Sequence, residues 1–234
     1  MVEQDGKNIF TEEGRLLQAE FAIKNVSEAG TIIGASFNDG AILIGVNAIK
    51  AKQLEKVYQI NQNCFVVVSG IFSDALRLVR FARVKSAQIK EELGILPKVS
   101  VLCELLSMEM QYYTQNIRAR PFGVCFLFVG YENNKYVLQS IDPSGTINNW
   151  KACCFGTSED IINSSLRTNV GKLECSVDEG AYNILKILSS AKEWSADLSE
   201  KLEILIFTEK GSRMMRLDEI NSILDQIEKK KLEQ

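Results

Sequence analysis

A stripe of apolar residues three and four positions apart predicts an amphipathic helix near the start of the chain. We expect it within residues 11–30, with Thr11 as N-cap, helical residues from about Glu12 to Ala29, and Gly30 as the stop. The stripe consists of Leu16, Ala19, Ile23 and Val26. Polar residues occupy the opposite side, so one face of this helix requires a packing partner.

Beyond this helix, short apolar runs bounded by turn residues alternate with longer segments of helical period. The runs that predict strands lie at 31–37, 41–48, 56–60, 64–69, 122–131, 135–141, 150–156, 202–208 and 212–217. The segments that predict helices lie at 71–93, 99–116, 158–168, 177–194 and from 218 onward. Strands joined by short turns pair antiparallel, and pairs of helices between such groups are typical of sheets covered by helices.

No linker rich in proline or serine interrupts this pattern, so we expect one domain over residues 1–234. Residues 1–9 form a tail ahead of the first helix. Residues 218–234 are rich in charge, and we expect a C-terminal helix there that faces solvent.

Composition narrows the possible partners. An apolar content of 46% over 234 residues is enough for a sizeable single core. The 27 Lys and Arg nearly balance the 30 Asp and Glu, and a net charge of -3 provides no global field for nucleic acid or an anionic membrane. No run reaches the about 18 apolar residues of a membrane span, and the first residues do not form a signal peptide. We therefore expect no nucleic-acid or membrane partner, and a location in the cytosol or nucleus.

Candidate chemistry is sparse. Histidine is absent, which removes the usual general base of serine and cysteine triads and the commonest nitrogen ligand of zinc. No glycine-rich phosphate loop follows a strand, and no closely spaced acidic set suits a hard cation. The six cysteines include no C-x-x-C pair and lie mostly in apolar runs, which indicates reduced, buried thiols. The sequence therefore predicts no cofactor and no metal.

Four motifs, in this order and spacing, resemble the proteasome α-type subunits, whose opening reads F-S-P-E-G-R-L-x-Q-V-E-Y-A. They are FTEEGRLLQAEFA, SGIFSDALRLVRFAR, TQNIRARPFGVCFLFVGY and DPSGTINNWKACCFG. The similarity extends from about Phe10 into the terminal helix. The stretch DPSG with the following WKA is most similar to the third position of the eukaryotic α ring.

The resemblance implies an α+β fold, a four-layer αββα sandwich shared with N-terminal nucleophile hydrolases, with an added N-terminal helix that packs against ring neighbours. It implies a non-catalytic structural and gating subunit of the proteasome core particle. Such a subunit forms a hetero-heptameric outer ring with other α-type subunits and stacks on β-type subunits. It also docks the regulatory ATPase particle or other activators in ubiquitin-dependent protein degradation. A homomeric scaffold outside the proteasome is the alternative of a different class.

A threonine peptidase is the enzymatic alternative, because active β-type relatives are cleaved at Gly-Thr to expose a threonine amine. This chain has Gly30 followed by Thr31, but in the β-type pattern the nucleophile position falls on Gly30. No Asp or Glu occurs between Gly40 and Leu54, where the β-type site requires a carboxylate. We therefore expect no catalytic residues.

Lys56 occupies the lysine position of that pattern and requires another interpretation. The resemblance implies that Lys56 lines a pocket between adjacent α-type subunits, together with Gly70 and Ile71, where C-terminal carboxylates of activators dock. The simpler alternative is an exposed lysine that pairs with Glu55 or with nothing and contributes about 0–1 kcal/mol.

The gate region departs from the family. Typical α-type chains carry Tyr-Asp seven and six residues before the motif phenylalanine, and these residues join the proline and the tyrosine of the motif in an open-gate cluster. Counting from Phe10, the corresponding positions are Glu3, Gln4, Glu12 and Phe21. All four differ, and Phe21 lacks the hydroxyl while Glu12 lacks the fixed angle of proline. We hypothesise that this tail cannot join such a cluster and is either disordered or held in a different closed arrangement.

Arg118 and Arg120 precede a strand that begins with proline. We interpret them as part of a solvated or inter-subunit loop and assign them no chemistry.

Overall fold

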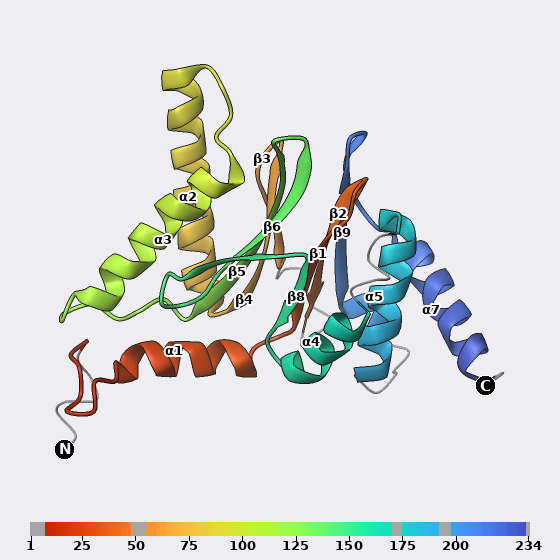
Figure 1. Ribbon diagram of the computed structural model, residues 1–234, viewed down its shortest axis with the longest axis horizontal. Coiled ribbons are helices and arrows are strands. Elements are labelled where there is room, and N and C mark those ends of the chain that lie inside the picture. The colour runs from red at the N-terminus through yellow and green to blue at the C-terminus, as the bar shows by residue number, and fades with distance from the viewer. Residues whose placement is uncertain (1–7, 48–54, 170–174, 192–197, 233–234) are drawn as a thin grey trace.

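Two five-stranded antiparallel sheets lie face to face, and the computed structural model describes residues 8–47, 55–169, 175–191 and 198–232 (Figure 1). In spatial order, the first sheet consists of β10 (Gly211–Met214), β9 (Leu202–Thr208), β2 (Gly40–Val46), β1 (Ile32–Ser36) and β8 (Ala152–Phe155). The second sheet consists of β3 (Val57–Asn61), β4 (Cys64–Gly70), β5 (Val124–Glu132), β6 (Lys135–Ile141) and β7 (Ile147–Trp150).

Helices cover the outer face of each sheet (Figure 1). The second sheet carries α2 (Phe72–Leu93) and α3 (Val99–Gln115), and the first carries α4 (Glu159–Thr168), α5 (Val177–Ala191) and α7 (Leu217–Leu232). A short helix, α6 (Leu198–Lys201), precedes β9. The N-terminal helix α1 (Leu17–Glu28) lies across one end of the sandwich and contacts β4 and β5. The expected αββα sandwich with an added N-terminal helix is confirmed. Among the helices of the described segments, none has both the length and the apolar character that crossing a bilayer requires.

The core between the sheets explains why they stack. Leu43 and Phe207 of the first sheet belong to the same buried cluster as Phe65 and Leu127 of the second, and each is at most 6% exposed. The rings of Phe65 and Phe207 are 5.1 Å apart between centroids. Burying a side chain of this size contributes about 1.5–3 kcal/mol, so a few such contacts stabilise the stacked arrangement substantially.

The first helix begins later than expected, at Leu17 rather than at Glu12. The reason is a local turn, in which Gly14 has a positive φ of 78° and its N–H donates to Thr11 O at 2.9 Å. The Thr11 hydroxyl accepts from the Arg15 N–H at 3.2 Å, inside this turn rather than at a helix N-cap. Leu16 takes the N-cap position without a side-chain cap.

The buried stripe of α1 also differs from the expected one. Ala19, Ala22 and Val26 are buried, whereas Ile23 is 45% exposed. The helix therefore contacts the sandwich through small side chains, and Ile23 lies on the side turned away from it.

The segment 150–156 is not one strand, as its composition suggested, but a crossing between the two sheets. Trp150 ends β7 and pairs with Leu138 in the second sheet, while Ala152 begins β8 and pairs with Ala35 in the first. Lys151, which lies between them, is where the chain passes from one sheet to the other, so its neighbours belong to different layers.

The C-terminal helix is only partly solvated, contrary to the expectation of a solvent-facing helix. Ile220, Leu224 and Ile227 are each at most 2% exposed and join the cluster beneath α5. These residues recur at helical spacing, so the charged residues between them face solvent while the apolar stripe packs.

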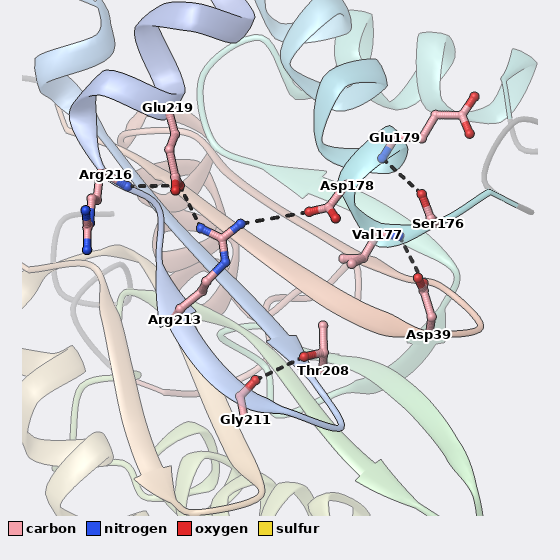
Figure 2. Close-up of polar contacts among 10 residues, drawn as sticks. All are labelled: Asp39, Ser176, Val177, Asp178, Glu179, Thr208, Gly211, Arg213, Arg216 and Glu219. Atoms are coloured by element: carbon pink, nitrogen blue, oxygen red, sulfur yellow. Dashed lines mark hydrogen bonds and ion pairs between the residues drawn. The ribbon is translucent and has the colours of Figure 1, made fainter.

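Charged side chains tie the beginning of α7 to the beginning of α5 (Figure 2). Arg213 of β10 contacts Glu219 of α7 at 2.6 Å and Asp178 of α5 at 3.9 Å. Both acids lie in the first turns of their helices, where the helix dipole favours negative charge. Asp39 in the β1–β2 turn accepts from the Val177 N–H at 2.9 Å and so holds α5 to the first sheet. These exposed pairs orient the helices at modest gain.

The six cysteines, all within the described residues, form no disulfides, and five of them are buried. Burial raises the pKa of the Cys64, Cys103 and Cys125 thiols above the usual range. They stay protonated and act as small apolar side chains, as expected.

Candidate functional site

The candidate site lies at the end of the sandwich where α1 passes into β1. Gly30, between these two elements, presents its carbonyl oxygen to two side chains. Lys56 Nζ donates to Gly30 O at 2.8 Å, and Ser69 Oγ donates to the same oxygen at 2.8 Å. The ammonium is therefore held at a defined point rather than extended into solvent, and Lys56 is partly buried. The interpretation of Lys56 as an exposed lysine is wrong.

Two glycines make room for this lysine. A Cβ on Gly30 would lie 2.5 Å from Lys56 Nζ and 2.7 Å from the carbonyl oxygen of Val46. A Cβ on Gly45 would lie 2.9 Å from Lys56 Cβ. Since the Val46 oxygen belongs to the backbone of β2, a side chain at position 30 would force a strand to move. Gly30 itself has no side chain, so position 30 of this chain supplies no nucleophile.

The backbone of Lys56 is held from both sheets. Its N–H donates to Glu203 Oε2 of β9 at 2.8 Å, and the adjacent Val57 N–H donates to the same oxygen at 3.2 Å. Its carbonyl oxygen accepts from the Val68 N–H of β4 at 3.1 Å. The other carboxylate oxygen of Glu203 accepts from Asn47 Nδ2 at 2.6 Å. The sequence analysis missed Glu203, whose available signal was one acid within the apolar run LEILIF.

Gly70 and Ile71, the other two expected pocket residues, follow Ser69 directly and lie at the same end of the sandwich. Gly70 has a φ of 124°, and a Cβ there would stand 2.1 Å from Gly123 O, so only glycine fits. The Ile71 N–H donates to that same oxygen at 2.8 Å. Because Lys56 and Ser69 share Gly30 O, the structure brings the three expected pocket residues to one edge.

An ion pair between the buried Asp74 and the exposed Arg120 supports the loop behind Ile71. Arg120 donates to both oxygens of Asp74, at 2.7 and 2.8 Å, and the Gly123 N–H donates to Asp74 Oδ2 at 3.0 Å. Burial alone would raise the pKa of Asp74, but the hydrogen bonds from Arg120 and Gly123 outweigh it and hold that pKa below its usual range. Arg120 therefore has a structural role that the sequence analysis did not assign, while Arg118 is exposed.

Thr31 has no nucleophilic geometry. Its side chain is fully buried, and its hydroxyl donates to Thr157 O at 2.7 Å, with Thr157 Oγ1 at 3.1 Å. Among the described residues, no group of His, Cys, Asp and Glu side chains is arranged to hold a metal ion.

The gate residues are only partly within the described structure. Glu3 and Gln4 lie outside the described residues. Glu12 is exposed in the turn ahead of α1, and Phe21 is 53% exposed on that helix. The root of the tail is Asn8, which is only 6% exposed. Its amide Nδ2 donates toward one carbonyl oxygen in the last turn of α3, that of Tyr113 at 2.7 Å, and toward two beyond the helix, those of Asn116 at 2.9 Å and Ala119 at 2.6 Å.

Comparison with known proteins shows the family of this chain. Residues 26–207 match the family described as proteasome subunit. The chain belongs to this family. It is 41% identical to the probable proteasome subunit alpha type-3 of Encephalitozoon cuniculi, over 95% of this chain and 97% of that protein. It is 35% identical to the proteasome subunit alpha type-4 of Petunia hybrida, over 84% and 81% of the two chains. With the proteasome subunit alpha type-3 of Saccharomyces cerevisiae, identity is 34% over 83% and 78%.

These relatives are α-type subunits, which are the non-catalytic subunits of the proteasome core particle. The α-type resemblance seen in the sequence motifs is thereby confirmed. This proteasome subunit is a structural component of the outer ring, assembles with other proteasome subunits, and is not a peptidase. Gly30 has no side chain that could act as a nucleophile, and the side chain of Thr31 is fully buried, which is consistent with this role.

Proposed function

We propose that this subunit docks the C-terminal carboxylate of an activator chain at Lys56, within a hetero-heptameric α ring that stacks on β-type subunits. The observation that carries the proposal is the position of the Lys56 ammonium, 2.8 Å from Gly30 O and at the same edge as Gly70 and Ile71. An ammonium carries three N–H groups, and a charge-assisted hydrogen bond to a carboxylate is short and strong. The regulatory ATPase particle or another activator would supply that carboxylate, in the cytosol or the nucleus.

The test is a titration with an activator-tail peptide on the assembled core particle. Because other α-type subunits offer similar pockets, the peptide carries a photo-crosslinking residue and the labelled chain is identified by its mass. Lys56→Met removes a charge-assisted contact of about 1.5–3 kcal/mol, so labelling of this chain should require roughly 10- to 150-fold more peptide.

Two controls sharpen the titration. A peptide with an amidated C-terminus should label the native chain as poorly as the acid peptide labels Lys56→Met. Lys210→Met removes an exposed lysine in the turn after β9, whereas the Lys56 segment contacts the beginning of β9. This variant should leave labelling unchanged. Equal labelling of native and Lys56→Met chains would refute docking at Lys56.

We also propose that the gate tail, residues 1–9, closes the pore rather than joining an open cluster. The observation that supports this role is the buried root of the tail, since Asn8 is held by three carbonyl oxygens. Deletion of residues 1–7, with Asn8 retained, should raise basal peptide hydrolysis by the assembled particle. Unchanged hydrolysis would favour a disordered tail, and an activator-bound structure with this tail in the open turn of its neighbours would refute the proposal.

A further inference from the structure

The contacts of Glu203 assign a role to a residue that lies outside the expected pocket. Its carboxylate accepts N–H groups from three residues: Asn47, which follows β2, Lys56, which precedes β3, and Val57, which begins β3. Glu203 pairs directly with Gly45 across β9 and β2. Residues directly opposite each other in antiparallel strands point to the same face, so Glu203 projects toward the space that Gly45 leaves open. The stem of Lys56 occupies that space.

Glu203 thereby determines where the lysine side chain begins. Its Oε2 holds the N–H of Lys56 from the first sheet, and the Val68 N–H holds the carbonyl of Lys56 from the second. The two sheets thus hold one peptide segment between them, immediately before β3. A lysine side chain has four rotatable bonds, so its ammonium reaches a defined point only if the backbone is fixed and the methylene stem is packed. Here the stem packs on Gly45 and the ammonium reaches Gly30 O.

We infer that Glu203, assisted by Asn47, is the positioning residue of the activator-tail pocket. It fixes the backbone of the Lys56 segment, and this places the Lys56 ammonium where a terminal carboxylate would bind. This inference rests on the proposed docking function of Lys56. Glu203 does not touch the incoming chain in this scheme and acts only through the lysine.

The chain offers a variant that separates geometry from charge. In Glu203→Gln, the amide oxygen still accepts from the N–H groups of Lys56 and Val57. The amide of Asn47 can turn over and present its oxygen to the new NH₂ group, so the contacts persist while the negative charge is lost. Glu203→Ala removes every acceptor. If Glu203 positions Lys56, the Gln variant behaves like the native protein and the Ala variant does not.

The first measurement follows Lys56 itself and does not depend on docking. Assembled particles are treated with a small amine-acylating reagent, and the acylation rate of Lys56 is measured by mass spectrometry. Release of the ammonium from Gly30 should accelerate acylation several-fold in Glu203→Ala and leave it within about twofold of native in Glu203→Gln. Lys210 should react equally in all three particles, which controls for general loosening. An unchanged Lys56 rate in assembled Glu203→Ala particles would overturn the inference.

The second measurement is the crosslinking titration with the activator-tail peptide. Glu203→Ala should weaken labelling about 5- to 20-fold, and Glu203→Gln by less than about twofold. In a Lys56→Met background, Glu203→Ala should cause no further loss, whereas a general structural defect would add to it. Tighter labelling in both Glu203 variants would mean that Glu203 competes with the tail carboxylate, and would refute positioning. If Lys56→Met alone leaves labelling unchanged, the docking proposal fails, and the acylation rates still decide whether Glu203 holds Lys56.

Should Glu203→Ala fail to assemble, Asn47→Ala provides the second variant. It removes one donor and leaves the N–H groups of Lys56 and Val57 on the carboxylate. We expect a smaller acceleration of Lys56 acylation, about twofold, with full assembly. A rate equal to the native rate would count against the inference.

Discussion

Removing Arg120 should destabilise the subunit measurably, although nothing in the family motif assigns it a role. Arg120→Met deletes two charge-assisted hydrogen bonds to Asp74, whose side chain is 7% exposed. Breaking a fully buried pair costs about 3–5 kcal/mol because an uncompensated charge remains. In Arg120→Met, the Gly123 N–H still donates a hydrogen bond to Asp74. The Arg120 side chain is also 58% exposed, so solvent already screens the native ion pair. We therefore expect a loss of about 1.5–3 kcal/mol.

The assay is urea unfolding of the purified subunit, followed by tryptophan fluorescence. The pH dependence identifies the cause. The pKa of Asp74 is lowered in the folded protein, so the pair contributes fully above the unfolded-state pKa of about 3.9 and is lost as the pH falls through the lower folded value. The stability difference between native and Arg120→Met proteins should stay constant from about pH 7 to about pH 5 and shrink below about pH 4.

Arg118→Met is the matched control, because Arg118 is also exposed, lies two residues away, and donates to Asn116 Oδ1 through its backbone N–H. We expect a change within about 0.5 kcal/mol. An Arg120→Met effect equally small, or one that persists unchanged at about pH 3, would refute the reasoning.

Three further predictions concern other contacts. Asn8→Ala removes the amide that contacts three carbonyl oxygens, so limited proteolysis ahead of α1 should accelerate about tenfold, and an unchanged rate would deny Asn8 an anchoring role. Gly70→Ala places a Cβ against Gly123 O at a φ of 124°, so thermal unfolding should show a loss of at least about 3 kcal/mol; a native melting temperature would contradict this. Thr31→Ala should leave peptide hydrolysis by the assembled particle unchanged, and mass spectrometry should find the Gly30–Thr31 bond intact. Labelling of Thr31 by a threonine-directed covalent inhibitor would contradict that expectation.

Most elements could be predicted from the sequence because the signals that specify them are local. Apolar alternation, helical period and the Asp39-Gly40 turn depend on residues within a few positions of one another, and β1 and β2 pair across that turn as expected. The errors fall where a neighbour in space overrides the local pattern. Trp150 and Ala152 are two residues apart yet pair with strands of different sheets, and no local pattern specifies the sheet to which each belongs.

The candidate site divides in the same way. Its residues Lys56, Gly70 and Ile71 were identified by resemblance to a family, and the same comparison with the β-type pattern placed the nucleophile position on Gly30. The sequence did not indicate that Glu203 holds the Lys56 segment, because the two residues lie 147 positions apart and Glu203 belongs to a strand of the other sheet than β3, which follows Lys56.

What the sequence determined by itself is therefore most of the order of strands and helices and the antiparallel hairpins. Only the tertiary structure decided which hydrogen-bond partners Lys56, Asp74 and Glu203 have. A charged group is tolerated below the surface only where donors or acceptors from distant segments converge on it, and that convergence is a property of the packed layers.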